Sequence, residues 1–299
     1  MPFEQILGNE KVKDELIKQI QTDHVLHSYL FVGNEGIGKK RMATEFAKML
    51  LCREQEKPCG HCKSCIAFDG DNHPDFHIVE ASGTIKIEQI RMLQEKTLEK
   101  PIISNRKVYL IDDSEKMTTE AQNCLLKTLE EPPEYITIIL LTSNESKILK
   151  TILSRCTKIY FEPISDEILM SYLQKQGETV TKQMIQMCEG SLKKAKELQE
   201  KIPLYQEVEK ICKELDSISL LALFQKAKIL YENKEEIEDL LAYMNILFLE
   251  KSKQERKGSI HYLNAMQLVE RTMKKIQGNS NFDMSLDQLL FQIWEEINS

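Results

Sequence analysis

The sequence predicts an α/β domain built on a mostly parallel sheet, followed by helical domains. Three observations support this fold class. Short β-rich segments alternate with helical patterns through the first half of the chain, which is typical of a parallel sheet covered by helices on both faces. A glycine-rich loop follows the first of these segments. Beyond Pro163 the strand pattern stops, and helical patterns continue to the C-terminus.

The expected elements of the α/β domain follow one another in regular order. Apolar residues recur on one face of 11–21, which predicts an amphipathic helix. Further helices are expected at 39–51, 87–99 and 118–131, and strands at 29–32, 76–79, 108–111, 136–141 and 158–161. The last of these helices can begin at a threonine cap and must end before Pro132-Pro133.

We divide the chain into three domains, which its 299 residues allow. Residues 1–163 form the α/β domain, 164–202 a small helical domain, and 203–299 an all-helical domain. The helical patterns of the last domain include 218–231, 237–251 and 261–276. In a final amphipathic segment, Trp294 is expected to pack in the core.

The overall composition is that of an ordinary globular protein, with 29% charged and 41% hydrophobic residues. A net charge of −7 argues against binding nucleic acid unaided through a broad basic surface. The apolar stretch Ile138–Leu141 is too short to span a bilayer. The N-terminus lacks the basic start and apolar run of a signal peptide. We therefore expect a cytoplasmic protein without a membrane partner.

Residues Gly33–Lys40, GNEGIGKK, match a phosphate-binding loop except at the last position. In such a loop Gly33, Gly36 and Gly38 let backbone N–H groups curl around a phosphate, and Lys39 reaches the outer phosphates. Lys40 replaces the Ser or Thr whose hydroxyl holds Mg²⁺, and an ammonium has no lone pair for a metal. The sequence therefore predicts a degenerate site for ATP and Mg²⁺.

A second feature of phosphate chemistry follows the apolar strand 108–111. Asp112 stands where proteins with this loop hold Mg²⁺. Asp113 stands where the related ATPases usually carry a glutamate that polarises the attacking water. Aspartate is one methylene shorter, about 1.5 Å, which is enough to misplace a general base. Acidic residues after a strand are also ordinary turn formers, and that alternative stays open.

Four of the eight cysteines lie within fourteen residues: Cys52, Cys59, Cys62 and Cys65. Three of them are spaced at three-residue intervals, and Gly60 permits a tight turn between the first two. Such crowding without a secretory signal favours a metal over disulfides. Four thiolates form a closed, structural Zn²⁺ site rather than a catalytic one. A reactive dithiol and unrelated core cysteines are the alternatives. His61 could replace one of the thiols as a ligand, but its position inside the knuckle favours a bystander role.

Several further motifs together resemble the AAA+ clamp-loader family. They are Ile6-Leu7-Gly8, His27–Phe31, the segment LLKTLEEPP at 125–133, and Ser154-Arg155-Cys156. The resemblance covers about residues 3–165 and includes the cysteine knuckle (52–65) inserted after the helix that follows the phosphate-binding loop. It implies an AAA+ domain, a helical lid domain and a C-terminal collar domain that oligomerises.

The resemblance also implies roles for individual residues. Arg155 would reach across a subunit interface to a neighbour's ATP, because a guanidinium stabilises charge on a transferred phosphoryl group. A structural ion pair is the alternative role. Thr142-Ser143-Asn144 resembles the family's first sensor, and Gly190–Lys193 its second, in which Lys193 replaces the usual arginine.

The departures from the family pattern point in one direction. Lys40, Asp113 and Lys193 all weaken the chain's own ATP site, whereas Arg155 is intact. The expectation is a non-hydrolysing structural subunit of the DNA polymerase III clamp loader. Its expected partners are delta and gamma/tau-type subunits, the sliding clamp and primed DNA. The alternatives are an ATP-hydrolysing subunit of the same family and a stand-alone zinc-dependent nucleic-acid binder, which the acidic composition disfavours.

Overall fold

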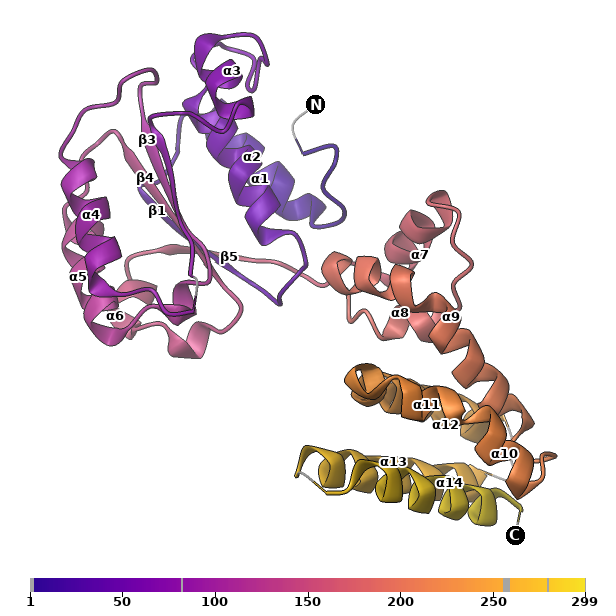
Figure 1. The fold of residues 1–299 in the computed structure, drawn as a ribbon. Helices are drawn as coiled ribbons and strands as arrows, with labels where there is room; N and C mark the ends of the chain where they lie inside the picture. Colours follow the sequence, from indigo (N-terminus) through magenta and orange to yellow (C-terminus); the bar gives the residue numbers. More distant parts are fainter. Residues whose placement is uncertain (1–2, 82, 255–258, 279, 299) are drawn as a thin grey trace. The chain divides into compact units, whose positions relative to one another are not determined.

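The computed structural model describes residues 3–81, 83–254, 259–278 and 280–298. The chain divides into two compact units. The N-terminal unit contains Met1–Ile168 and also the short segment Gly190–Lys193. The C-terminal unit contains Leu169–Glu189 and Lys194–Ser299. Figure 1 follows the chain through both units by colour.

A five-stranded parallel sheet forms the centre of the N-terminal unit, with the strand order β2-β3-β4-β1-β5. Its strands are β1 (Ser28–Val32), β2 (Phe76–Val79), β3 (Lys107–Ile111), β4 (Ile136–Thr142) and β5 (Thr157–Tyr160). Every residue of β3 and β4 is buried, as expected where helices cover both faces of a parallel sheet. All five strands expected from the sequence are present, displaced by one residue at most at either end.

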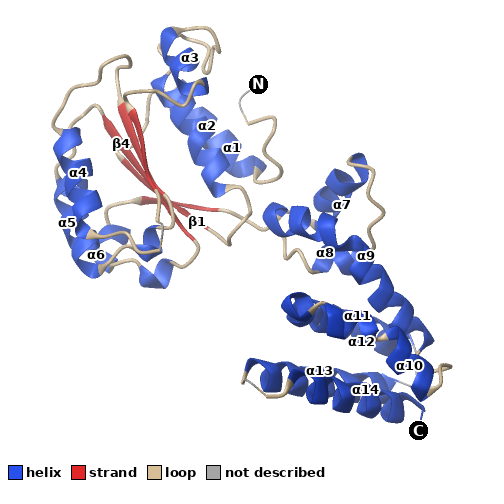
Figure 2. Ribbon diagram, viewed as in Figure 1, coloured by secondary structure: helices blue, strands red, loops and turns tan. Residues whose placement is uncertain are grey.

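Helices cover both faces of this sheet, as Figures 1 and 2 show. One face packs against α1 (Glu10–Gln21) and α2 (Lys39–Leu51), and its core includes Tyr29 and Phe46, whose rings meet edge to face at 5.4 Å. The other face packs against α4 (Ile87–Thr97), α5 (Thr119–Glu130) and α6 (Lys150–Leu153). The predicted fold class is confirmed.

The limits of the helices follow local chemistry. The side chain of Thr118 accepts a hydrogen bond from the N–H of Ala121 and caps α5, as the sequence indicated. The helix α5 then ends at Glu130, just before the two prolines. Short elements that the sequence patterns did not indicate are α3 (Lys63–Asp69) and a single-turn 3₁₀ helix, η1 (Ser114–Lys116). A second 3₁₀ turn, η2 (Glu145–Lys147), precedes α6.

The rest of the chain is helical. Its elements are α7 (Asp166–Lys175), α8 (Lys182–Gln186), α9 (Leu192–Glu214), α10 (Leu220–Lys226), α11 (Lys228–Glu232), η3 (Lys234–Glu236), α12 (Ile237–Gln254), α13 (Ser259–Gln277) and α14 (Phe282–Asn298). The pattern 218–231 is interrupted at Ala227 and forms two helices instead of one. None of the helices in the described part of the chain combines the length and apolar character needed to cross a membrane.

Two expectations for the helical part concern boundaries and packing. The helix α9 runs without a break through the expected domain boundary at 202/203, with Pro203 inside it. The division into lid and collar domains therefore stays a prediction. Leu289, Leu290 and Ile293 of α14 are buried. Trp294 is only partly buried, and its indole N–H donates to the carbonyl oxygen of Ile218 at 2.8 Å.

Candidate functional site

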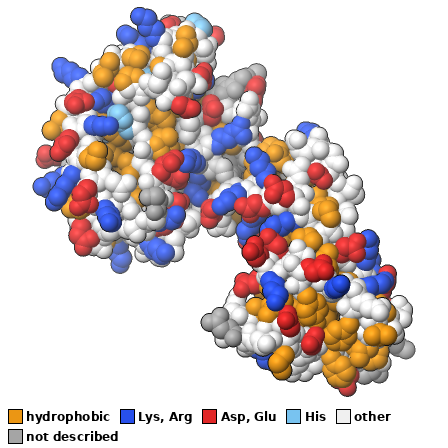
Figure 3. Space-filling model, in the orientation of Figure 1, with side chains coloured by type: hydrophobic (Ala, Val, Ile, Leu, Met, Phe, Trp, Pro, Cys, Tyr) orange, Lys and Arg blue, Asp and Glu red, His pale blue; other side chains and the backbone are white. Residues whose placement is uncertain are grey.

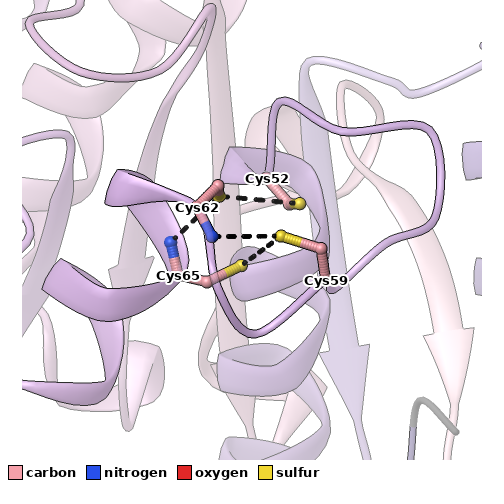
Figure 4. Close-up of side chains that lie close together, drawn as sticks. All are labelled: Cys52, Cys59, Cys62 and Cys65. Atoms are coloured by element: carbon pink, nitrogen blue, oxygen red, sulfur yellow. Dashed lines mark hydrogen bonds between the residues drawn. The ribbon is translucent and has the colours of Figure 1, made fainter.

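The cysteine knuckle brings four sulfur atoms together beside α2 and α3 (Figure 4). All four Sγ atoms lie within 4.8 Å of one another. The distance is 4.0 Å between Cys52 and Cys62 and 3.9 Å between Cys59 and Cys65. A tetrahedral thiolate site with Zn–S bonds of 2.3 Å requires sulfur–sulfur distances of about 3.8 Å. The arrangement can therefore hold a metal ion without a large rearrangement.

Backbone N–H groups point at two of these sulfurs. The N–H of Cys62 donates to Cys59 Sγ at 3.3 Å, and the N–H of Cys65 donates to Cys62 Sγ at 3.4 Å. Burial acts to raise the pKa of Cys62, but hydrogen bonds from the N–H of Cys65 and from the thiols of Cys59 and Cys65 outweigh it and lower the pKa to about 6. Burial raises the pKa of Cys65 to about 12. His61 is exposed, with its Nδ1 against the carbonyl oxygen of Cys59 at 2.9 Å, outside the sulfur cluster.

A buried polar network that the sequence did not indicate anchors the knuckle to the α/β core. The hydroxyls of Ser64 and Ser104 both donate to the carbonyl oxygen of Leu51, at 2.8 and 2.7 Å. His73 Nε2 lies 2.9 Å from the Ser64 hydroxyl, while its Nδ1 accepts the N–H of Asp75. Burial lowers the pKa of His73, which favours the neutral ring. Because Nδ1 accepts the N–H of Asp75, the ring proton lies on Nε2. The base of the knuckle is thus fixed.

The glycine-rich loop is held against the second-sensor segment. Gly36 has φ +77°, and a Cβ on it would lie 2.1 Å from the Ser191 hydroxyl, so only glycine fits. The N–H groups of Leu192 and Lys193 donate to the carbonyl oxygen of Gly36 at 3.0 and 3.4 Å. The structure therefore joins two motifs that lie more than 150 residues apart in the sequence.

Lys39 is folded onto its own loop. Its Nζ donates to the carbonyl oxygens of Gly33 and Asn34 at 2.6 and 2.7 Å. Burial lowers the pKa of Lys39, although carboxylates nearby, with Glu115 the largest contributor, act in the opposite direction. A phosphate entering the loop has to replace these two carbonyl contacts of the ammonium.

Lys40 points at the carboxylate that was expected to hold Mg²⁺. Its Nζ lies 3.0 Å from Asp112 Oδ2 and 2.6 Å from Glu80 Oε1. Burial acts to lower the pKa of Lys40, but the bonds to both carboxylates outweigh it and raise the pKa. The ammonium stays charged and neutralises Asp112 directly. A divalent cation at Asp112 would have to displace it against charge repulsion.

Arg155 lies on a different part of the N-terminal unit, directly after α6. Its guanidinium NH2 contacts Glu130 Oε1 at 2.7 Å, and NH1 donates to the carbonyl oxygen of Thr151 at 2.9 Å. None of its contacts within the described residues involves the loop 33–40. The structure therefore contains the ion pair that was the alternative to a role of Arg155 at a neighbour's ATP. The pair is weak in stability terms, because the Arg155 and Glu130 side chains are 35% and 48% exposed.

A family model described as "DNA polymerase III, delta subunit" matches residues 8–165, more than half of the chain. The chain belongs to this family. It is thus a member of the DNA polymerase III clamp-loader family, and the recognition from sequence motifs is confirmed. The matched residues include the sheet, its helices, the knuckle, the glycine-rich loop and Arg155, but not the segment 190–193.

Individual relatives match somewhat more than half of this clamp-loader-family protein. The chain is 37% identical over 168 residues to the DNA polymerase III subunit delta′ of Bacillus subtilis, which is 56% of this chain and 51% of that protein. It is 35% identical over 173 residues to the subunit tau/gamma of Haemophilus influenzae, covering 57% of this chain and 25% of that protein. The matched segments thus span about half or less of these relatives.

One solved structure is matched over nearly the whole length of the chain. A DNA polymerase III gamma-subunit-related protein of Thermotoga maritima is matched over 95% of this chain and 100% of its own length. The sequence identity is 19%, and the TM-score is 0.49.

Two acidic residues of this clamp-loader-family protein contact the candidate nucleotide site, and sequence reasoning missed both. Glu80 binds Lys40, as described above. Glu115 accepts hydrogen bonds from the N–H, at 3.0 Å, and the hydroxyl of Ser143 in the first-sensor segment. Burial acts to raise the pKa of Glu115, but these bonds outweigh it and lower the pKa. No spacing or periodicity marks either residue in the sequence.

The remaining expected site residues are also engaged in ion pairs. Asp113 has φ +49°, and its carboxylate binds Lys116 Nζ at 2.7 Å. Lys193 Nζ binds Glu35 Oε1 at 2.7 Å. Around the glycine-rich loop, lysine side chains therefore form ion pairs with carboxylates. A Mg²⁺–nucleotide complex would require such charged groups to be free to bind the metal and the phosphates.

Proposed function

We propose that the chain is a non-hydrolysing, delta-prime-type structural subunit of the DNA polymerase III clamp loader. The observation that carries this proposal is the ammonium of Lys40 bound to Asp112 and Glu80. In phosphoryl transfer by related folds, Mg²⁺ bridges the phosphate oxygens and neutralises developing charge. A lysine at that carboxylate neutralises Asp112 but offers no metal a ligand. Arg155 would then serve the ATP site of a neighbouring subunit.

The purified chain is expected to show no ATP hydrolysis above background. The physical reason is the joint loss of the Mg²⁺-binding hydroxyl at Lys40 and of the glutamate replaced by Asp113, whose carboxylate binds Lys116. Phosphate release at saturating ATP and Mg²⁺ measures this. Steady turnover that disappears in Lys39→Ala would show that the site is active and that the proposal is wrong.

A companion variant tests the role of the ammonium itself. The substitution Lys40→Thr removes the ammonium that binds Asp112 and Glu80 and places a threonine hydroxyl near the two carboxylates. We expect this variant to bind Mn²⁺ at least about tenfold more tightly than the wild type in the presence of ATP. Electron paramagnetic resonance of free Mn²⁺ measures the difference. Equal binding by both proteins would show that Lys40 does not exclude the metal.

The proposed partners are other loader subunits, of the delta and gamma/tau type, with the sliding clamp and primed DNA bound by the assembly. The C-terminal unit carries a surface suited to subunit contact. Figure 3 shows hydrophobic side chains gathered on one face of it. The exposed large hydrophobic residues of this unit include Leu221, Ile260, Leu263, Met284 and Phe291. Native mass measurement of mixtures with purified loader subunits tests this, and a chain that joins none of them would contradict it.

A structural Zn²⁺ in the cysteine knuckle belongs to the same proposal. Four thiolates at tetrahedral spacing leave no open position for a substrate or a water. The ion would therefore hold Cys52 and the loop before α3 in place without taking part in nucleotide chemistry. The residues that would bind it are Cys52, Cys59, Cys62 and Cys65.

A second candidate function is an ATP-hydrolysing subunit of the same family. The observation that favours it is the 35% identity to a tau/gamma subunit over 173 residues, which is 57% of this chain. It requires Lys40 to leave Asp112 when nucleotide and Mg²⁺ bind. The ATPase measurement above separates the two candidates, because only the second allows turnover by the purified chain.

A further inference from the structure

We propose that Glu130 is a positioning residue, which holds the Arg155 guanidinium in the orientation needed to reach a neighbouring subunit's ATP. The proposal rests on the function proposed above and adds to it. Its starting point is the contact of 2.7 Å between Glu130 Oε1 and Arg155 NH2.

The guanidinium of Arg155 is restrained from two sides while donors stay available. NH1 donates to the carbonyl oxygen of Thr151 at 2.9 Å and lies 3.4 Å from the Ser154 hydroxyl. NH2 contacts Glu130. A guanidinium has five N–H donors in a fixed planar fork, so these contacts leave donors for an anion. The side chain is 35% exposed, which keeps the group accessible to another subunit.

The carboxylate that restrains Arg155 comes from a rigid element. Glu130 lies in the last turn of α5, and the helix ends there before Pro132. The side chain of Gln122, on the same helix, accepts the N–H of Leu149 at 2.8 Å and donates to the carbonyl oxygen of Lys147 at 3.1 Å. Near its N-terminal end, α5 is thus hydrogen-bonded to the segment that leads into α6. Near its C-terminal end, α5 is bound to Arg155 through Glu130.

The backbone of Arg155 is also fixed. The hydroxyl of Ser28 in β1 donates to the carbonyl oxygen of Arg155 at 2.7 Å. The neighbouring Ile152 and Cys156 are buried. With its main chain anchored to the sheet, the orientation of the guanidinium depends on its side-chain torsions. Glu130 is the charged side chain that restrains them.

The energetics favour a positioning role over a stabilising one. Both side chains are partly exposed, and an ion pair of that kind contributes little to folding stability because water screens it. Reactive geometry is far more sensitive, since a misplacement of about 1 Å can reduce a rate about 10²-fold. The same carboxylate partly offsets the positive charge of Arg155. Orientation and charge cancellation therefore predict opposite effects when Glu130 is removed.

The test uses the assembled clamp loader with its clamp and primed DNA, at matched subunit composition. We expect Glu130→Ala to lower the kcat of ATP hydrolysis about threefold to tenfold at the site that Arg155 serves, with little change in KM. The matched control is Glu131→Ala, which removes an adjacent exposed carboxylate and should leave the rate unchanged. Glu130→Gln, which keeps an acceptor oxygen for NH2, should restore part of the lost rate.

The decisive comparison is a double-mutant cycle with Arg155→Ala. If Glu130 acts through Arg155, the double variant should be as slow as Arg155→Ala alone. Additive losses, an unchanged rate or a faster rate in Glu130→Ala would overturn the positioning role. If Arg155→Ala itself leaves the rate unchanged, the proposed function fails instead. The two failures are therefore distinguishable.

Discussion

Arg155→Ala is expected to lower ATP hydrolysis by an assembled clamp loader while leaving the fold and assembly of this chain intact. A trans arginine in phosphoryl transfer contributes about 10³–10⁵ in rate at the site where it is the main charge stabiliser. The total rate should fall less, because the other ATP sites of the assembly have their own partners. The measurement is clamp-stimulated ATPase of wild-type and variant assemblies at the same subunit composition.

The stability side of this prediction follows from the structure. Removing the guanidinium loses a partly exposed ion pair, worth at most about 1 kcal/mol. The carbonyl contact from Ser28 is made by the backbone of residue 155 and survives the substitution. Thermal unfolding should therefore change little. Lys40→Thr should not rescue the variant, since it alters a different site. Equal ATPase rates in both assemblies would assign Arg155 a purely structural role.

Cys62→Ser is expected to reduce the bound zinc from about one ion per chain to a small fraction of that value. The sulfur of Cys62 lies 4.0 Å from that of Cys52 and accepts the N–H of Cys65, so it belongs to the centre of the cluster. A serine hydroxyl is a poor zinc ligand beside thiolates, and zinc-finger peptides derive about 10–16 kcal/mol from such sites. Elemental analysis of protein prepared without chelator measures the content.

The knuckle should loosen in this variant without loss of the α/β core. It is inserted between α2 and β2, outside the parallel sheet. The Ser64, Ser104 and His73 network keeps its own hydrogen bonds. His61→Ala is the matched control and should retain the metal, because the imidazole lies outside the sulfur cluster. Wild-type protein without zinc, or zinc lost equally in the control, would contradict the tetrathiolate assignment.

Much of the N-terminal unit could be predicted from sequence because its signals are local. The five strands appear as short apolar runs, and their limits differ from the expected ones by one residue at most. Thr118 and the two prolines mark the limits of α5. Less could be predicted where helices are short, as at α3 and η1, since a turn or two of helix has no apolar period to detect.

For the candidate sites too, local motifs could be predicted from the sequence, whereas contacts between distant residues could not. The spacing of the four cysteines, the glycine-rich loop and the motif around Arg155 are readable in the sequence because each lies within a short segment. The partners that define their chemistry are not. Glu80 lies 40 residues from Lys40, and Gly36 receives hydrogen bonds from residues 192 and 193. Such pairs have no common pattern, and only folding brings them together.

By itself, the sequence determined the α/β fold class, the family, and the residue types at each candidate site. Only the tertiary structure decided that Lys40 binds Asp112 and that Glu130 binds Arg155. The physical reason is that secondary structure and ligand spacing depend on neighbours along the chain. Ion pairs and hydrogen bonds between distant side chains depend on how the parallel strands order themselves, and that order is set by packing of the whole sheet.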